Sequence, residues 1–213
     1  MLLLSVPALA GCALQEEERS TRDELAAMVL PQPTLGPAYA GLVLDEESSG
    51  LLDNAEAAKR SLDKKDTRED LIRAGRIDGY VQSFAPEERK KRLAEVSTTV
   101  ELLRDPAAAA GYLHLRLESY AKLKHAKHFE VTPLAHQSAG VRFPTETKRR
   151  QLHTTIVIFR RGRVVATALV KRTDDRDARG ETQRLARVLD SRVAWVLAGE
   201  EPRDPEPVAA SLS

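Results

Sequence analysis

The stretch QLHTTIVIFRRGRVVATALVKR, residues 151–172, decides the fold. Arg161-Gly162 is predicted as the two-residue turn of a β-hairpin, between strands over residues 151–160 and 163–172. This register pairs Arg160 with Arg163, Phe159 with Val164, Ile158 with Val165, Val157 with Ala166, Ile156 with Thr167, Thr154 with Leu169 and His153 with Val170. Both faces of the hairpin are then largely apolar, whereas a sheet wetted on one side alternates apolar and polar residues. The sequence therefore predicts a central hairpin that is covered on both faces.

The segments before the hairpin predict further strands and one long helix. Residues 76–84 and 93–103 are strand candidates, and shorter ones follow at 129–134 and 140–143. The second strand has Val96, Thr98, Val100 and Leu102 on one face and Glu95, Ser97, Thr99 and Glu101 on the other. Asp105-Pro106 is a favourable helix start, and that helix is expected to run to about residue 127.

The remaining helices are predicted from apolar spacing and from residues that begin or end helices. Residues 23–30 fit two turns stopped by Pro31, and residues 54–62 fit another short helix. Thr67-Arg-Glu-Asp70 resembles a capping box, with Gly75 placed to end the helix. A last helix, closed by Gly199, carries apolar residues at helical spacing: Leu185, Val188, Leu189, Val193, Val196 and Leu197.

The predicted fold class is therefore α+β, with an antiparallel sheet of about five or six strands flanked by helices. Over residues 76–198 this layout is similar in outline to the PsbP-like family of small α/β proteins, some of which are bacterial lipoproteins. The resemblance lies in the order of the elements and involves no sequence motif. It implies an accessory role in binding proteins or ligands rather than catalysis, and it transfers no functional residue.

The N-terminal residues are typical of a signal that directs a protein to the cell envelope. An apolar run ends in Leu9-Ala10-Gly11-Cys12, and Cys12 is the only cysteine of the chain. This tetrad resembles a bacterial lipobox, which implies cleavage between Gly11 and Cys12 and a diacylglyceryl group on the Cys12 thiol. No Lys or Arg follows Met1, although signal peptides carry a basic start, and a misassigned start codon is one explanation. The alternative is an apolar tail that packs on its own domain, with Cys12 an inert thiol.

This interpretation divides the chain into a signal peptide (1–11), a polar tether (12–23), a single α+β domain (24–199) and a disordered tail (200–213). Lys and Arg total 33 against 32 Asp and Glu, and only 4% of residues are aromatic. Nucleic-acid binders usually show a basic excess and stacking aromatic rings, so we expect no nucleic-acid partner.

No motif predicts a catalytic centre, a metal or a cofactor. The histidines are His114, His125, His128, His136 and His153. His125 and His128 could share a helix face, but two ligands do not make a zinc site, which needs three or four. The chain has no nucleophile elbow and no phosphate-binding loop. We therefore expect a non-enzymatic protein without cofactors.

The expected function is that of a lipid-anchored envelope protein, extracytoplasmic and attached to a membrane through Cys12, whose domain binds an envelope protein or a lipid ligand. Arg160, Arg161 and Arg163 at the hairpin tip form a candidate contact surface for anionic head groups. Two alternatives stay open: a secreted enzyme whose residues form no recognisable motif, and a cytosolic domain whose N-terminus mimics a leader. A cavity between the sheet and the helix at 106–127 would favour binding if mainly apolar, and catalysis if it held convergent buried titratable groups.

Overall fold

The computed structural model describes residues 21–61, 67–87, 93–146, 151–174 and 176–203. Residues 21–28 are helical. The elements that follow are, in chain order, α2 (Gln32–Leu35), η1 (Pro37–Tyr39), β1 (Leu42–Leu44), β2 (Gly50–Leu51), α3 (Asn54–Arg60), α4 (Arg68–Arg73), β3 (Arg76–Pro86), β4 (Leu93–Leu103), α5 (Pro106–Ala121), β5 (Lys127–Phe129), β6 (Gln137–Glu146), β7 (Gln151–Arg161), β8 (Val164–Arg172) and α6 (Arg179–Leu197).

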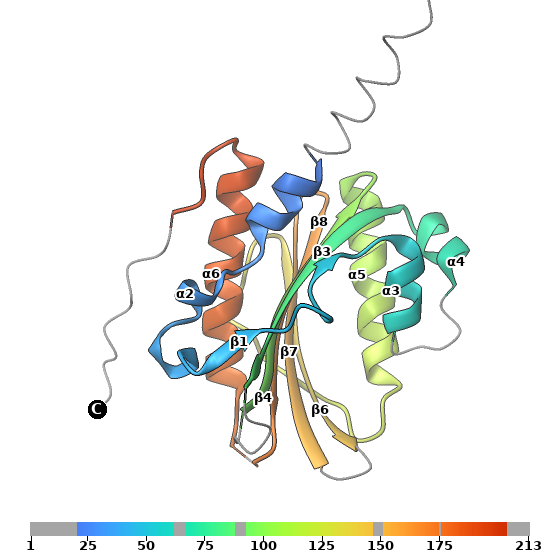
Figure 1. The fold of residues 1–213 in the computed structure, drawn as a ribbon. Coiled ribbons are helices and arrows are strands. Elements are labelled where there is room, and N and C mark those ends of the chain that lie inside the picture. Colours follow the sequence, from blue (N-terminus) through green and yellow to red (C-terminus); the bar gives the residue numbers. More distant parts are fainter. Residues whose placement is uncertain (1–20, 62–66, 88–92, 147–150, 175, 204–213) are drawn as a thin grey trace, which may run out of the picture.

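One antiparallel sheet forms the middle layer, with helices on both of its faces (Figure 1). Seven of its eight strands follow the order β1-β3-β4-β8-β7-β6-β5, and the eighth, β2, pairs with β3 on the same side as β1. The α+β class is confirmed, with more strands than the five or six expected. The additional strands are β1 and β2, which span three and two residues. Such short strands are too brief to show an alternating pattern in the sequence.

The hairpin β7–β8 occupies the centre of the sheet, as predicted, but its turn lies one residue later. Arg161 pairs with Val164, so Gly162 and Arg163 form the turn. Gly162 has φ +57°, which a glycine adopts readily at the first central position of a hairpin turn. Each predicted partner is consequently wrong by two residues, and His153 lies opposite Arg172 instead of Val170. Because side chains alternate with period two, this slip leaves every residue on the predicted face.

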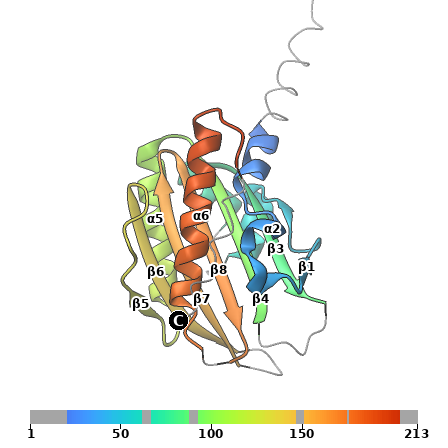
Figure 2. The ribbon, with the colours of Figure 1, turned by 90° about the vertical axis from the view of Figure 1, so that its left-hand side faces the viewer.

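α6 covers one face of the sheet (Figure 2), and the side chains between them are apolar. The helical residues 21–28 lie on the same side, and Leu25, Met28 and Val29 join its buried cluster. The strands contribute small and branched side chains that are fully or almost fully buried: Val96, Val100, Val157, Phe159, Val164, Ala166, Ala168 and Val170. From α6 come Leu185, Ala186, Leu189 and Val193. Leu197, expected on this apolar stripe, is 44% exposed instead because it lies in the last turn of α6.

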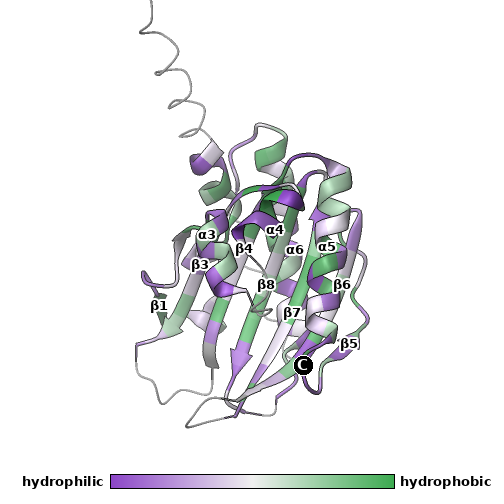
Figure 3. Ribbon diagram, turned by 90° about the vertical axis from the view of Figure 1, so that its right-hand side faces the viewer, coloured by the Kyte–Doolittle hydropathy of each residue, from purple (hydrophilic) through white to green (hydrophobic). Residues whose placement is uncertain are grey.

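The opposite face is covered by α3, α4 and α5 (Figure 3). Its apolar cluster includes Leu71 of α4, Leu113 of α5, Val141 of β6 and Ile156 of β7. α5 ends at Ala121 and not near residue 127, because Tyr120 is its last buried side chain. The shared helical face expected for two histidines is therefore wrong: His125 lies in a turn with φ +61°, and His128 lies in β5.

The predicted helix starts are confirmed by their hydrogen bonds. The carboxylate of Asp105 accepts from Ala108 N at 2.7 Å, and Pro106 follows at the first helical position. Thr67 and Asp70 form the predicted reciprocal capping box, and Gly75 after α4 has φ +86°. The strand expected at 129–134 is instead the short β5, which ends at Phe129.

Candidate functional site

A groove of about 630 Å³ lies between the sheet and the two helices α3 and α5. Strands β3, β4, β6, β7 and β8 form its floor, whereas α3 and α5 form its walls. In Figure 3 these helices stand in front of the sheet on either side of β8. The α5 side of the sheet therefore has a cavity, the feature by which the binding and the catalytic alternatives were to be distinguished.

The floor is rich in hydroxyl groups because polar side chains on neighbouring strands fall in register. Thr99 of β4 lies between Val81 of β3 and Thr167 of β8. In the next row, Ser97 lies between Ser83 and Leu169. The side chains of Glu95, Ser97, Thr99 and Glu101, one predicted face of β4, all line the groove. Leu52, Ile156 and Phe143 add apolar surface, so the lining suits a ligand with both polar and apolar parts.

A buried ion pair closes one part of this floor. The Arg76 Nε donates to Glu101 Oε1 at 2.9 Å, and both side chains are almost entirely buried. The other guanidinium nitrogens of Arg76 donate to Asn54 Oδ1 at 2.8 Å and to Leu52 O at 2.7 Å. Gly79 makes room for this arrangement, since a Cβ there would lie 2.6 Å from an Arg76 nitrogen. Arg76 is thus fully engaged in holding the loop before α3 against the sheet.

Tyr112 of α5 completes the pair by donating its hydroxyl to the same Glu101 oxygen at 2.7 Å. Burial alone would raise the pKa of Glu101, but the charges of Arg76 and Arg116 hold that pKa below its ordinary value. Burial, followed by the charge of Glu101, raises the pKa of Tyr112. At neutral pH Glu101 is therefore ionised and Tyr112 is protonated, so neither residue is poised for proton transfer.

Arg116 lies one helical turn after Tyr112 and also lines the groove. One of its terminal nitrogens donates to Tyr120 Oη at 3.1 Å, and its guanidinium carbon lies 5.4 Å from the centre of the Tyr120 ring. Its Nε is buried and has no hydrogen-bond partner among the described residues. This nitrogen is a charged donor without an acceptor inside the groove wall.

The other positively charged side chains that line the groove, Lys171 and Arg60, are paired. Lys171 binds Glu95 at 2.5 Å, and the Arg60 Nε donates to Glu56 Oε1 at 2.7 Å. Beside Lys171, on β7 and β6, the hydroxyls of Thr154 and Thr145 share a hydrogen bond of 3.1 Å.

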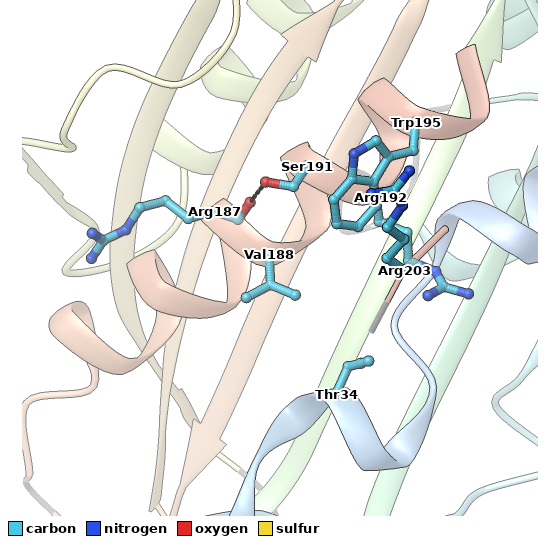
Figure 4. A pocket seen from close by; sticks show the side chains of 7 residues that line it. All are labelled: Thr34, Arg187, Val188, Ser191, Arg192, Trp195 and Arg203. Carbon is cyan, nitrogen blue, oxygen red and sulfur yellow. Dashed lines mark hydrogen bonds between the residues drawn. The ribbon is translucent and has the colours of Figure 1, made fainter. Parts of the chain in front are cut away.

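Two further hollows are smaller. One, of about 400 Å³, lies between α4 and α5 and shares Tyr112 and Arg116 with the groove, so these two residues stand between both hollows. The other, of about 150 Å³, lies beside Trp195 on α6 (Figure 4). Its lining includes Arg192, whose Nε already donates to Ala27 O. The groove has a larger volume than either of these two hollows.

The hairpin tip offers fewer free charges than the sequence indicates. Arg161 makes a bidentate ion pair with Asp190 of α6, at 2.7 and 2.9 Å. The Arg160 Nε donates to Gln137 Oε1 at 3.1 Å, whereas Arg163 is exposed. Cys12 and Gly11 lie outside the described residues.

The histidines lie outside the groove. His114, His125, His128 and His136 are exposed and His153 is half-buried. Within the described ranges, no group of three or more His, Cys, Asp or Glu side chains could hold a metal ion.

Sequence reasoning recognised the polar face of β4 but missed its partner on α5. Tyr112, Arg116 and Tyr120 recur every fourth residue, which places an arginine between two aromatic side chains on one helix face. That spacing was a readable signal for a charged residue turned toward the core. Arg76 had no comparable signal, because its partner Glu101 is 25 residues away.

The comparisons with known proteins concern the fold. No protein-family model matches the sequence, and no curated protein matches it. Among solved structures, the extracellular domain of PknH from Mycobacterium tuberculosis is similar, with a TM-score of 0.53 and 9% sequence identity. The match covers 83% of this chain and 96% of that domain. A separate observation is that none of the described helices has the length and hydropathy needed to cross a membrane.

Proposed function

We propose that this chain is a lipid-anchored protein of the bacterial envelope whose domain binds a ligand in the groove between the sheet, α3 and α5, without catalysing a reaction. The observation that carries the proposal is the groove itself, which combines hydroxyls, apolar side chains and charged groups. A space of this size and mixed lining is typical of small-molecule sites.

The state of the titratable groups supports binding over catalysis. A general acid or base needs a pKa near the working pH. Here the pKa of Glu101 lies below its ordinary value and that of Tyr112 above it. Glu95 is held by Lys171, and the histidines lie elsewhere.

An extracytoplasmic location is supported by two independent features. The tetrad Leu9-Ala10-Gly11-Cys12 resembles a lipobox, and the similar fold from PknH is an extracellular domain. Two acyl chains on Cys12 would give stable anchoring, because each buried CH₂ contributes about 0.8 kcal/mol. The domain would then meet its ligand at the membrane surface.

The binding proposal is tested with N-phenyl-1-naphthylamine, a neutral apolar dye whose fluorescence rises when it leaves water. Thr99→Trp fills the groove floor, and Val43→Trp places the same side chain on β1, where Val43 is 46% exposed. We expect the first variant to weaken dye binding at least about tenfold and the second to leave it unchanged. Equal binding by both variants would exclude the groove as the ligand site.

The anchoring proposal is tested by cell fractionation and mass spectrometry. The native protein should resist extraction from membranes by high salt and yield to detergent, whereas Cys12→Ala should appear in the soluble fraction. Recovery of an unmodified Cys12 in a peptide that begins at Met1 would refute lipidation.

A further inference from the structure

We propose that Arg116 makes the α5 wall of the groove a receptor for an oxyanion, so that the ligand carries a phosphate, sulfonate or carboxylate group attached to an apolar body. This inference rests on the proposed binding function, because it assigns the chemistry of the ligand in that groove. It begins from the Arg116 Nε, which is buried and has no hydrogen-bond partner among the described residues.

The contrast with the other groove cations shows that this lack of a partner is specific to Arg116. The Arg60 Nε donates a hydrogen bond to Glu56, and one of its terminal nitrogens donates to Ser48 O. Lys171 is held by Glu95. A buried donor without an acceptor is unfavourable, and a charged one more so. Proteins accept such an arrangement where a ligand supplies the missing acceptor.

Charge balance around Arg116 points to an anion in particular. Glu101 is the acidic residue of the cluster, and its Oε1 already accepts from Arg76 and Tyr112. Tyr120 accepts from a terminal nitrogen of Arg116 but, as a phenol, adds no full charge. Within this cluster, two guanidinium groups thus share one carboxylate, which leaves one positive charge beside Tyr112 and Tyr120. A bound oxyanion would balance that charge.

The surrounding side chains define the remainder of the ligand. A guanidinium group binds oxyanions through charge-assisted hydrogen bonds, which are stronger than those between neutral groups. The hydroxyls of Ser97, Thr99 and Thr167 line the floor and can bind polar atoms next to the anionic group. Leu169, Ile156 and Phe143 offer apolar contact for the rest of the molecule. The ligand class is therefore a small amphiphile with one anionic end.

The direct test measures the NMR signal of the Arg116 Nε–Hε group. In ¹H–¹⁵N spectra of the full chain, the Nε–Hε signal of Arg116 is identified by its loss in Arg116→Lys. Phenyl phosphate should shift this signal, whereas benzyl alcohol, which lacks the anionic group, should not. Dihexanoyl phosphatidic acid supplies the lipid arm: a shift with phenyl phosphate alone assigns a soluble anion, and a shift with the lipid assigns a lipid headgroup. No shift with either compound overturns the inference.

The second test compares two dyes with the same aromatic body. 1-Anilinonaphthalene-8-sulfonate carries a sulfonate, and N-phenyl-1-naphthylamine does not. We expect Arg116→Gln to weaken binding of the anionic dye about tenfold or more and to leave the neutral dye unaffected. Arg60→Gln is the matched control, because it removes the same charge from the same groove at a position where the arginine is already paired.

The outcomes separate this inference from the proposed function. If Arg116→Gln and Arg60→Gln weaken the anionic dye equally, only general attraction is present and the Arg116 site is refuted, while groove binding stands. If Thr99→Trp leaves the anionic dye bound but Arg116→Gln releases it, the anion occupies the hollow between α4 and α5, and the groove assignment is wrong. If neither dye depends on Thr99, the binding proposal fails as well.

Discussion

The two faces of the sheet are built from the same strands but differ in chemistry. Toward α6, Val96, Val100 and Val157 are fully buried in an apolar cluster. Toward α5, the alternate residues Ser97, Thr99 and Glu101 line a groove and an ion-pair cluster. Because side chains alternate along a strand, one strand supplies stability on one face and a binding surface on the other. The Arg116 Nε without an acceptor is tolerated beside the second face because the first face carries the larger apolar cluster.

The largest contrast is expected from adjacent residues of β7. Val157→Asp should leave the protein unfolded, because an unpaired charge in the α6 core costs several kcal/mol against a total stability of about 5–15 kcal/mol. Ile156→Asp should be damaging but milder, since Ile156, although only 2% exposed, borders the groove, toward which a carboxylate can turn to reach water. Circular dichroism and urea unfolding measure both. A Val157→Asp protein that melts within a few degrees of the parent would contradict this view of the α6 face.

The second contrast lies beside the groove, between the buried Arg76 and the half-buried Arg116. Arg76→Met should lower the free energy of unfolding by about 3–5 kcal/mol. The substitution leaves Glu101 buried without its ion pair, and Asn54 Oδ1 and Leu52 O lose their hydrogen-bond donor. Arg116→Met should cost less, about 1 kcal/mol, because it removes the hydrogen bond to Tyr120 Oη but leaves the ion pair of Glu101 with Arg76 in place. Chemical unfolding of both variants provides the comparison. Equal losses would show that Arg116 is a structural residue.

Acid should lower the stability of the folded protein by protonating Glu101 on the groove face of the sheet. The pKa of this carboxyl in the folded protein lies below the ordinary value of 4.5. The ionised carboxylate therefore contributes its full stabilisation above that ordinary value, and the contribution is lost as the pH falls through the lower pKa of the folded state. Thermal unfolding between pH 7 and pH 2 should show a steeper acid loss in the parent than in Glu101→Gln. Identical acid slopes would mean that Glu101 is not responsible.

The smallest contrast concerns two neighbouring threonines of β4. Thr98 lies on the α6 face, where its Oγ1 accepts from Leu30 N at 3.1 Å, so Thr98→Val should cost about 1–3 kcal/mol by leaving a buried N–H without a partner. Thr99→Val on the groove face should be close to neutral, because Thr99 borders the open groove. Equilibrium unfolding resolves the difference. Reversed effects would mean that the two faces of β4 are exchanged.

Much of the fold was readable from local patterns. The apolar run of residues 151–172 predicted a central hairpin, and Asp105-Pro106 and Thr67 marked two helix starts that the structure confirms. The position of the turn was misread because Gly162 can fill either turn position when flanked by arginines on both sides. The C-terminal end of α5 and the short strands β1 and β2 were missed because they depend on contacts distant in the sequence.

The sequence by itself determined which residues share a face, since side-chain alternation survives even a slip in register. The polar row of β4 and the spacing of Tyr112, Arg116 and Tyr120 were both present in it. Only the tertiary structure decided that these two patterns meet, that Arg76 rather than Arg116 binds Glu101, and that a groove separates α3 from α5. The physical reason is that a buried charge takes its state from whichever partners packing brings within hydrogen-bond distance. Those partners come from segments that the local sequence does not link.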